Sequence, residues 1–176
     1  MKIVIPVLIS LLSFLPLPAL AHGISDDAPC PSNNDRIVKD VFTEEWRAVV
    51  CDGQGGMFMS LFKLDGSLGI GDTVTFGDGE YATNRSGGDS YILNLTAQTL
   101  SLSDPSYHGR LIPTVCVALE NPKDSLNLRD QDAEVIGSIP HGKRLGILSS
   151  SGETGYSSVV AYNIRGFAAT RFLKPC

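Results

Sequence analysis

The sequence predicts an all-β protein: a small antiparallel barrel or sandwich followed by a second, smaller barrel. Short apolar runs recur along most of the chain, and Gly, Asp, Asn or Pro residues lie between them. This is the pattern of short strands joined by tight turns. No segment keeps an apolar period of 3.6 residues over a long stretch, so a helical bundle is excluded.

Residues 1–21 are expected to be a cleaved export signal. Lys2 precedes an apolar run from Ile3 to Leu17, and the segment ends in Ala19-Leu20-Ala21, the small-x-small pattern of a signal peptidase site. The run is short for a membrane-spanning helix and is interrupted by prolines. We therefore expect a periplasmic or secreted protein without membrane insertion after cleavage. Its acidic net charge of −5 argues against nucleic acid as a partner.

The cysteines predict two disulfides. Four of them, Cys30, Cys51, Cys116 and Cys176, follow the export signal, and an even number in an oxidising compartment indicates complete pairing. Three pairings are possible, and the sequence does not choose among them. The spacings are wide and contain no C-x-x-C, which argues against a zinc site. We expect no metal and no cofactor.

The first unit is predicted over residues 22–122. Residues 22–35 form a polar arm that Cys30 attaches to the fold. Thr43, Glu44 and Glu45 resemble a helix cap and predict a short helix before a strand at 46–51. Further strands are expected at 57–64, 73–76, 80–83, 90–95, 98–103 and 111–120, with turns at Asp65-Gly66, Gly77-Asp78-Gly79 and Thr96-Ala97. Polar residues 120–125, which include a proline, mark the domain boundary.

Residues 123–176 form the second predicted unit. Its segments are "LNLR" at 126–129, "EVIGSIPHGKRLGIL" at 134–148 with a turn at Gly142, "YSSVVAY" at 156–162 and "RGFAATRFL" at 165–173. In this order they resemble the bacterial SH3-like domain family. The resemblance implies an SH3-like barrel that binds cell-wall glycopeptide or a protein partner without catalysis. The candidate ligand-binding residues are Arg129, Tyr156, Tyr162 and Phe172.

The first unit carries a second resemblance. The segments "WRAVVCDGQGG" and "DGEYATNRSGGDSY" are similar to the small periplasmic inhibitors of C-type lysozymes. The resemblance implies a serine-containing loop that enters the cleft of a wall-degrading enzyme. The residues of that loop here would be Arg85, Ser86, Gly87, Gly88 and Tyr91. An inhibitor or immunity protein against a lysozyme or amidase is therefore the first alternative function.

The sequence shows no catalytic constellation. Nucleophilic catalysis needs a base beside the nucleophile and a group that orients it, and none of the three histidines lies in such a motif. We therefore expect a binding protein of the bacterial envelope and no enzyme. Signal cleavage after Ala21 would make His22 the new N-terminus, with a free amine beside its imidazole. The amine and imidazole of His22 with His108 or His141 would form a three-nitrogen site suited to Cu(II), so a copper-binding protein is the second alternative.

Overall fold

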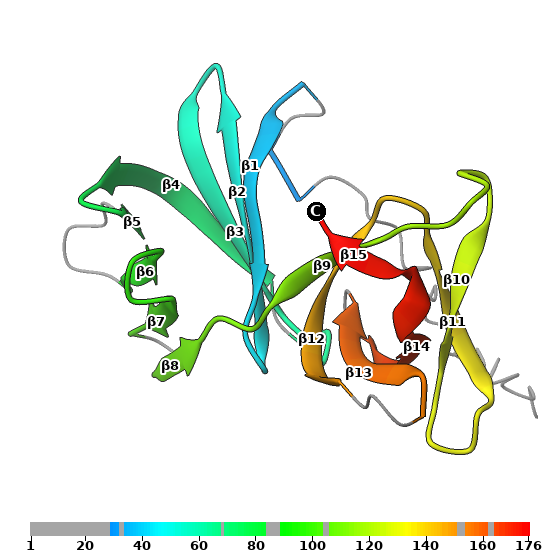
Figure 1. The fold of residues 1–176 in the computed structure, drawn as a ribbon. Helices are drawn as coiled ribbons and strands as arrows, with labels where there is room; N and C mark the ends of the chain where they lie inside the picture. Colours follow the sequence, from blue (N-terminus) through cyan, green and yellow to red (C-terminus); the bar gives the residue numbers. More distant parts are fainter. Residues whose placement is uncertain are drawn as a thin grey trace, which may run out of the picture.

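The computed structural model describes residues 29–31, 34–67, 69–83, 89–103, 106–150, 154–161 and 164–176. Within these residues the chain forms 15 strands and one short 3-10 turn, which confirms the all-β prediction. The strands form two antiparallel sheets that lie side by side (Figure 1). The predicted export signal, residues 1–21, lies outside the described residues.

The first sheet contains eight strands in sequence order and bends into a half-barrel. Its strands are β1 Arg36–Phe42, β2 Trp46–Gly53, β3 Gly56–Lys63, β4 Gly69–Gly77, β5 Glu80–Thr83, β6 Tyr91–Asn94, β7 Thr99–Leu102 and β8 Tyr107–Arg110. Alternate side chains face opposite sides of a strand. On β2, Trp46, Ala48 and Val50 enter the main core, whereas Val49 and Cys51 pack on the other face.

The second sheet contains seven strands in the order β11-β10-β14-β13-β12-β9-β15. Its strands are β9 Thr114–Val117, β10 Ser125–Arg129, β11 Val135–Pro140, β12 Arg144–Ser150, β13 Tyr156–Ala161, β14 Ile164–Ala169 and β15 Leu173–Pro175, with the 3-10 turn Thr170–Phe172 before β15. The sheet encloses its own core, in which Leu128, Leu145 and Val159 are almost fully buried.

Strand β9 belongs to the second sheet, although it precedes the sequence boundary at residue 122. It pairs with β12 and β15, and Val117 is buried in the second core. The second sheet therefore gains a strand from the segment that the sequence assigned to the first unit.

The chain turns where the sequence predicted turns. β3 and β4 are joined at Asp65-Gly66, β4 and β5 at Asp78-Gly79, and β11 and β12 at Gly142. Asp78, Gly79 and Gly142 have φ values of 51°, 81° and 78°, a region that Gly and Asp tolerate better than other residues.

The short helix predicted at the start of the segment 38–50 is wrong, because residues 38–42 belong to β1. Residues 43–45 form the turn between β1 and β2. The Thr43 hydroxyl oxygen accepts hydrogen bonds from the N–H groups of Glu45 and Trp46, and the hydroxyl also lies 3.2 Å from the Trp46 carbonyl. Thr43 therefore supplies the same side-chain interactions that would cap a helix, but β2 continues in extended form because its side chains are buried on both faces of the sheet.

The two sheets share a small core of their own. Phe42 of β1, Leu64 after β3 and Val160 of β13 are buried against one another, with Ile112 and Leu148 beside them. A single antiparallel bridge joins the backbones of Phe42 and Ile112. The side chain of Arg165 also donates a hydrogen bond to the carbonyl of Glu44. The two units are thus held together by apolar packing and by hydrogen bonds.

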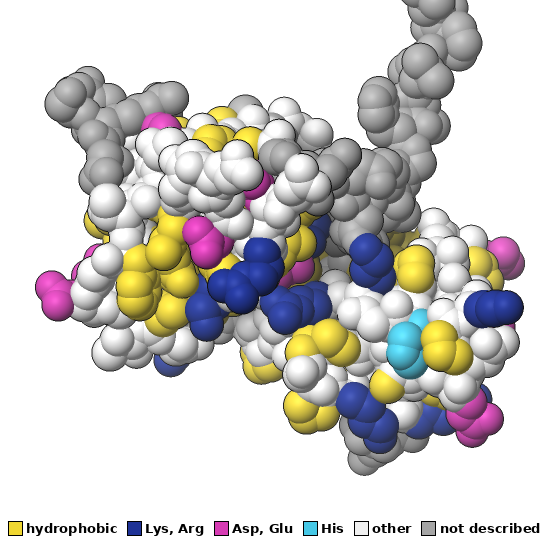
Figure 2. All heavy atoms as spheres, turned by 90° about the horizontal axis from the view of Figure 1, so that it is seen from above, with side chains coloured by type: hydrophobic (Ala, Val, Ile, Leu, Met, Phe, Trp, Pro, Cys, Tyr) yellow, Lys and Arg dark blue, Asp and Glu magenta, His cyan; other side chains and the backbone are white. Residues whose placement is uncertain are grey.

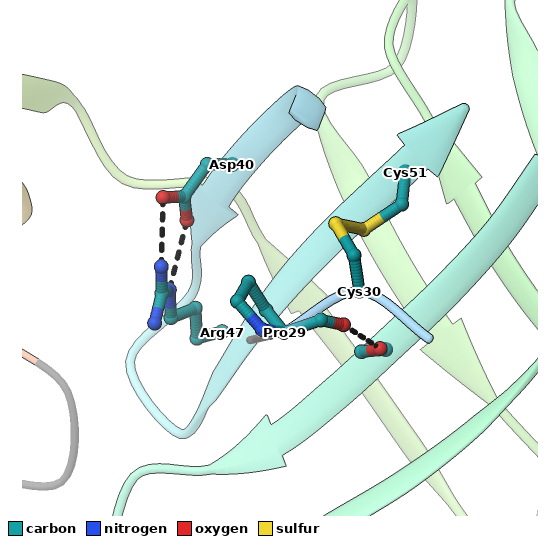
Figure 3. Close-up of a disulfide and its surroundings, with 6 residues drawn as sticks. Pro29, Cys30, Asp40, Arg47 and Cys51 are labelled. Atoms are coloured by element: carbon teal, nitrogen blue, oxygen red, sulfur yellow. Dashed lines mark hydrogen bonds and ion pairs between the residues drawn. A yellow bond between two sulfur atoms is a disulfide. The ribbon is translucent and has the colours of Figure 1, made fainter. Parts of the chain in front are cut away.

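Both predicted disulfides are present. They join Cys30 to Cys51 and Cys116 to Cys176, one of the three pairings that the sequence left open. Two disulfides are typical of a protein that folds in an oxidising, extracytoplasmic compartment. The first attaches the N-terminal arm to β2 (Figure 3), and the second attaches the C-terminal residue to β9.

Candidate functional site

The second unit contains a cavity of about 430 Å³, which we call the β13 hollow. Its lining residues come from the end of β10, the loop after it, the start of β13 and the middle of β14: Arg129, Asp130, Gln131, Ala133, Thr154, Tyr156 and Phe167. This volume lies within the range of small-molecule and peptide side-chain sites.

Strand order brings the main lining residues together. β14 lies between β10 and β13. Phe167 of β14 is opposite Arg129 of β10 on one side and opposite Ser158 of β13 on the other. Tyr156 begins β13, two residues before Ser158. A cation from one strand end and two aromatic rings from neighbouring strands therefore line the same cavity.

The loop after β10 is held by hydrogen bonds at one wall of the hollow. The Asp130 carboxylate accepts the backbone N–H groups of Asp132 and Glu134, each at 2.9 Å. Nη1 of Arg129 donates to the carbonyl of Ala133 at 2.7 Å. Ala133 has a φ of 65°, which makes a sharp bend. The loop thus fixes the Arg129 side chain.

The exposed groups of the hollow define what it can bind. The Tyr156 side chain is 39% exposed, and its ring offers an apolar face and a hydroxyl. An arginine has five N–H donors, so Arg129 keeps donors beyond the one used by Ala133. The hollow can therefore hold an apolar group against Tyr156 and Phe167 while Arg129 donates to a carbonyl or carboxylate.

Two of the four predicted ligand-binding residues, Arg129 and Tyr156, line this hollow together. Phe172 does not, because it lies in the 3-10 turn and lines a separate cavity with Leu119, Asp124 and Arg171. The guanidinium of Arg171 lies 4.6 Å from the centre of the Phe172 ring. Tyr162 lies outside the described residues.

Sequence reasoning missed Phe167. The residue belongs to the "RGFAATRFL" segment, in which the SH3-like resemblance uses the aromatic after Gly166 only as part of a fold pattern. Gly166 is buried, so the residue after it in a strand faces the opposite side of the sheet. That alternation is the signal that would have assigned Phe167 to the surface of the hollow.

The loop predicted for enzyme inhibition lies mostly outside the described part of the chain. Arg85, Ser86, Gly87 and Gly88 fall there. Tyr91 is described and is only 4% exposed, since its ring packs in the core of the first sheet. Its ring therefore stabilises the sheet rather than projecting from the loop toward a partner.

The histidines considered for copper are separated. His108 lies on β8 with its Nδ1 2.7 Å from the Ser101 hydroxyl. His141 lies in the turn after β11, and its Nδ1 accepts the N–H of Leu119 at 3.0 Å. His22 lies outside the described residues. Across the described ranges, no three His, Cys, Asp or Glu side chains form a group that could hold a metal ion.

Charge is unevenly distributed over the surface. Although the chain is acidic overall, Figure 2 shows Lys and Arg side chains gathered near the middle of one face, where the two lobes meet, with hydrophobic side chains on either side. A partner with negative charge and apolar groups is therefore compatible with this face despite the acidic total.

Comparisons with protein-family models, with curated proteins and with solved structures give no match. In the part of the chain that the structure describes, no helix has the length and apolar character needed to cross a bilayer.

Proposed function

We propose that this protein is a non-catalytic binding protein of the bacterial cell envelope, and that its second unit holds cell-wall glycopeptide in the β13 hollow. The observation that carries the proposal is the shared lining of that hollow by Arg129, Tyr156 and Phe167. Periplasmic localisation and the SH3-like character of residues 123–176 form part of the same proposal.

The chemistry of the hollow favours a short peptide over a polymer that binds through charge alone. Apolar walls with a few polar groups that fix orientation are typical of ligand pockets. The rings of Tyr156 and Phe167 provide apolar contact area, and Arg129 provides directed donors that suit a peptide carbonyl or carboxylate. The peptide stems of the cell wall offer apolar side chains, backbone carbonyls and carboxylates.

A sedimentation assay with purified peptidoglycan tests the proposal. The oxidised, exported protein is expected to sediment with peptidoglycan, and Tyr156→Ala is expected to lower the bound fraction at least tenfold. Tyr156→Phe keeps the ring and should retain most of the binding. Arg129→Ala should also weaken binding, although part of its effect comes from the lost hydrogen bond to Ala133.

Arg144→Ala is the matched control for Arg129→Ala, because Arg144 is an exposed arginine on the same unit and does not line the hollow. Absence of sedimentation by the wild-type protein would refute the proposal. Capture of a muramidase or amidase from an envelope extract, with loss of its activity, would instead favour the inhibitor hypothesis.

A further inference from the structure

A second cavity, of about 460 Å³, lies on the first unit, far from the β13 hollow in sequence. We call it the arm cleft. Pro31, Asn34 and Asp35 of the N-terminal arm form one wall, and the β2–β3 hairpin and β4 form the floor, where Gln54, Phe58 and Thr73 lie.

The Cys30–Cys51 disulfide holds the arm beside the sheet (Figure 3). Cys30 is buried at 9% exposure and packs with Val49 and Phe62. The hydroxyl of Ser60 donates a hydrogen bond to the carbonyl of Pro29. Two attachments therefore precede Pro31, so one wall of the cleft is fixed relative to β3.

An aromatic ring forms part of the floor. Phe58 of β3 is opposite Cys51 of β2 and Thr73 of β4. A Cβ atom added to Gly71 would lie 2.6 Å and 2.8 Å from two atoms of the Phe58 ring. The ring thus lies closely over the backbone of β4, in space that only glycine leaves open, and it is supported by the sheet beneath it.

The polar side chains of the lining are two amides, a hydroxyl and one carboxylate, and Pro31 and Met57 add apolar surface. Asn34, Gln54 and Thr73 supply donors and acceptors, and Asp35 supplies acceptors. No Lys or Arg belongs to the described lining of the cleft, which argues against an anionic ligand.

The position of the cleft also argues against an added peptide strand. Peptides that extend a sheet need an unpaired edge. β2 pairs with β1 and β3, and β3 pairs with β2 and β4. The cleft therefore offers side-chain hydrogen bonds and a supported aromatic ring, but no free strand edge.

From this arrangement we infer that the arm cleft binds a neutral saccharide. A pyranose ring has an apolar face of C–H groups, which packs against the electron-rich face of an aromatic ring, and hydroxyl groups at its rim that pair with amides and carboxylates. Phe58 supplies the first kind of contact, and Asn34, Asp35, Gln54 and Thr73 supply the second. This site is separate from the β13 hollow and does not depend on the function proposed for it.

Titration with three neutral trisaccharides, an N-acetylglucosamine trimer, cellotriose and maltotriose, tests the inference. The readout is the ¹H–¹⁵N NMR spectrum of the oxidised protein. At least one sugar is expected to shift the amide signals of Asn34, Gln54 and Phe58 in a saturable manner. No shift with any of the three at millimolar concentration, or shifts confined to other residues, would overturn the inference.

Point variants distinguish a loss of sugar contacts in the arm cleft from a loss of binding caused by a damaged fold. Phe58→Ala should weaken binding at least tenfold, whereas Phe58→Tyr should retain it. Phe76→Ala removes another exposed ring from β4, 51% exposed, and should leave binding unchanged. Gln54→Ala changes an exposed turn residue and should weaken binding with the fold intact. Unchanged binding in both Phe58→Ala and Gln54→Ala would contradict the inference.

The Cys30–Cys51 disulfide allows an independent test of the site. Replacing Cys30 and Cys51 together by Ser should reduce sugar binding, because the arm is then released from β2. Replacing Cys116 and Cys176 together is the matched control and should leave sugar binding unchanged. Equal sugar binding by the two double variants would contradict a role for the N-terminal arm in the sugar site.

Discussion

A charged pair lies inside the first sheet beside the turn between β1 and β2. Nε and Nη2 of Arg47 donate to the two carboxylate oxygens of Asp40 at 2.9 Å and 2.8 Å (Figure 3). The side chains of Arg47 and Asp40 are only 10% and 6% exposed. Their bidentate contact satisfies both charges where little water reaches.

This pair leads to a prediction about stability. Arg47→Ala should lower the free energy of unfolding by about 3–5 kcal/mol, because it leaves the Asp40 charge buried without its partner. The double variant Asp40→Leu/Arg47→Met should cost less than Arg47→Ala alone, since no charge then remains. Urea unfolding measures both. A larger loss in the double variant than in the single one would contradict this account.

Gly146 controls how closely the two sheets approach. A Cβ atom there would lie 2.6 Å from Cδ1 of Ile112 and 2.9 Å from Cβ of Phe42. Gly146→Ala should therefore destabilise the protein by about 1–3 kcal/mol through overpacking. Gly55→Ala is the control, because nothing lies within 4 Å of a Cβ atom at that position. Equal thermal stability of the two variants would contradict the prediction.

Asp65 illustrates a local electrostatic effect at a hairpin turn. Hydrogen bonds from the hydroxyl and the N–H of Ser67, with Lys63 nearby, lower the pKa of Asp65 from 3.8 to about 2. Because the folded pKa is depressed, the stabilisation is present above pH 3.8 and is lost as the pH falls through about 2. An NMR titration of the Asp65 carboxyl carbon should show this midpoint, and Ser67→Ala should raise it. An unchanged midpoint in Ser67→Ala would refute the assigned cause.

At the scale of single residues, the sequence predicted some site residues and missed others. Arg129 and Tyr156 were named through the resemblance to SH3-like domains, and both line one hollow. The arm cleft was not predicted, because residues 31–35 and 54–58 are far apart in the chain. The Cys30–Cys51 disulfide, the Ser60–Pro29 hydrogen bond and the pairing of β1 with β2 bring them together, and four cysteines allow three pairings.

Strand β9 carries Cys116, one half of the second disulfide. It is four residues long and lies between β12 and β15. β15 contains only three residues, and the Cys116–Cys176 disulfide joins the chain end to β9 across a sequence separation of 60 residues. The disulfide therefore supports a strand of three residues that pairs with β9.

Replacing Cys116 and Cys176 together by Ser should therefore lower the free energy of unfolding by about 2–5 kcal/mol. Hydrogen exchange should accelerate first at β15, because its residues pair only with β9. Uniform acceleration over both sheets, or an unchanged unfolding midpoint, would contradict this role for the disulfide.

Element by element, turn residues were more informative than capping residues. Asp65-Gly66, Asp78-Gly79 and Gly142 mark hairpins in the sequence and in the structure. Thr43 with two following glutamates resembles a helix start, but β2 is buried on both faces of the sheet from Trp46 to Cys51, which an extended chain allows. The sheet that receives β9 is fixed by pairing between distant segments, which local sequence does not encode.

At the scale of the whole molecule, two sheets with separate cores meet at a small shared core. The β13 hollow belongs to the second sheet and the arm cleft to the first. A protein that contacts peptide with one unit and saccharide with the other would recognise both components of cell-wall glycopeptide. Binding of intact wall material should then be stronger than binding of either component alone.

The most direct test of this account compares the wild-type protein with Tyr156→Ala on purified, intact peptidoglycan. The account predicts saturable binding by the wild-type protein and at least tenfold weaker binding by Tyr156→Ala, with unchanged unfolding midpoints. Equal binding by the two proteins, or no binding by the wild type, would contradict the central claim that the β13 hollow recognises the cell wall.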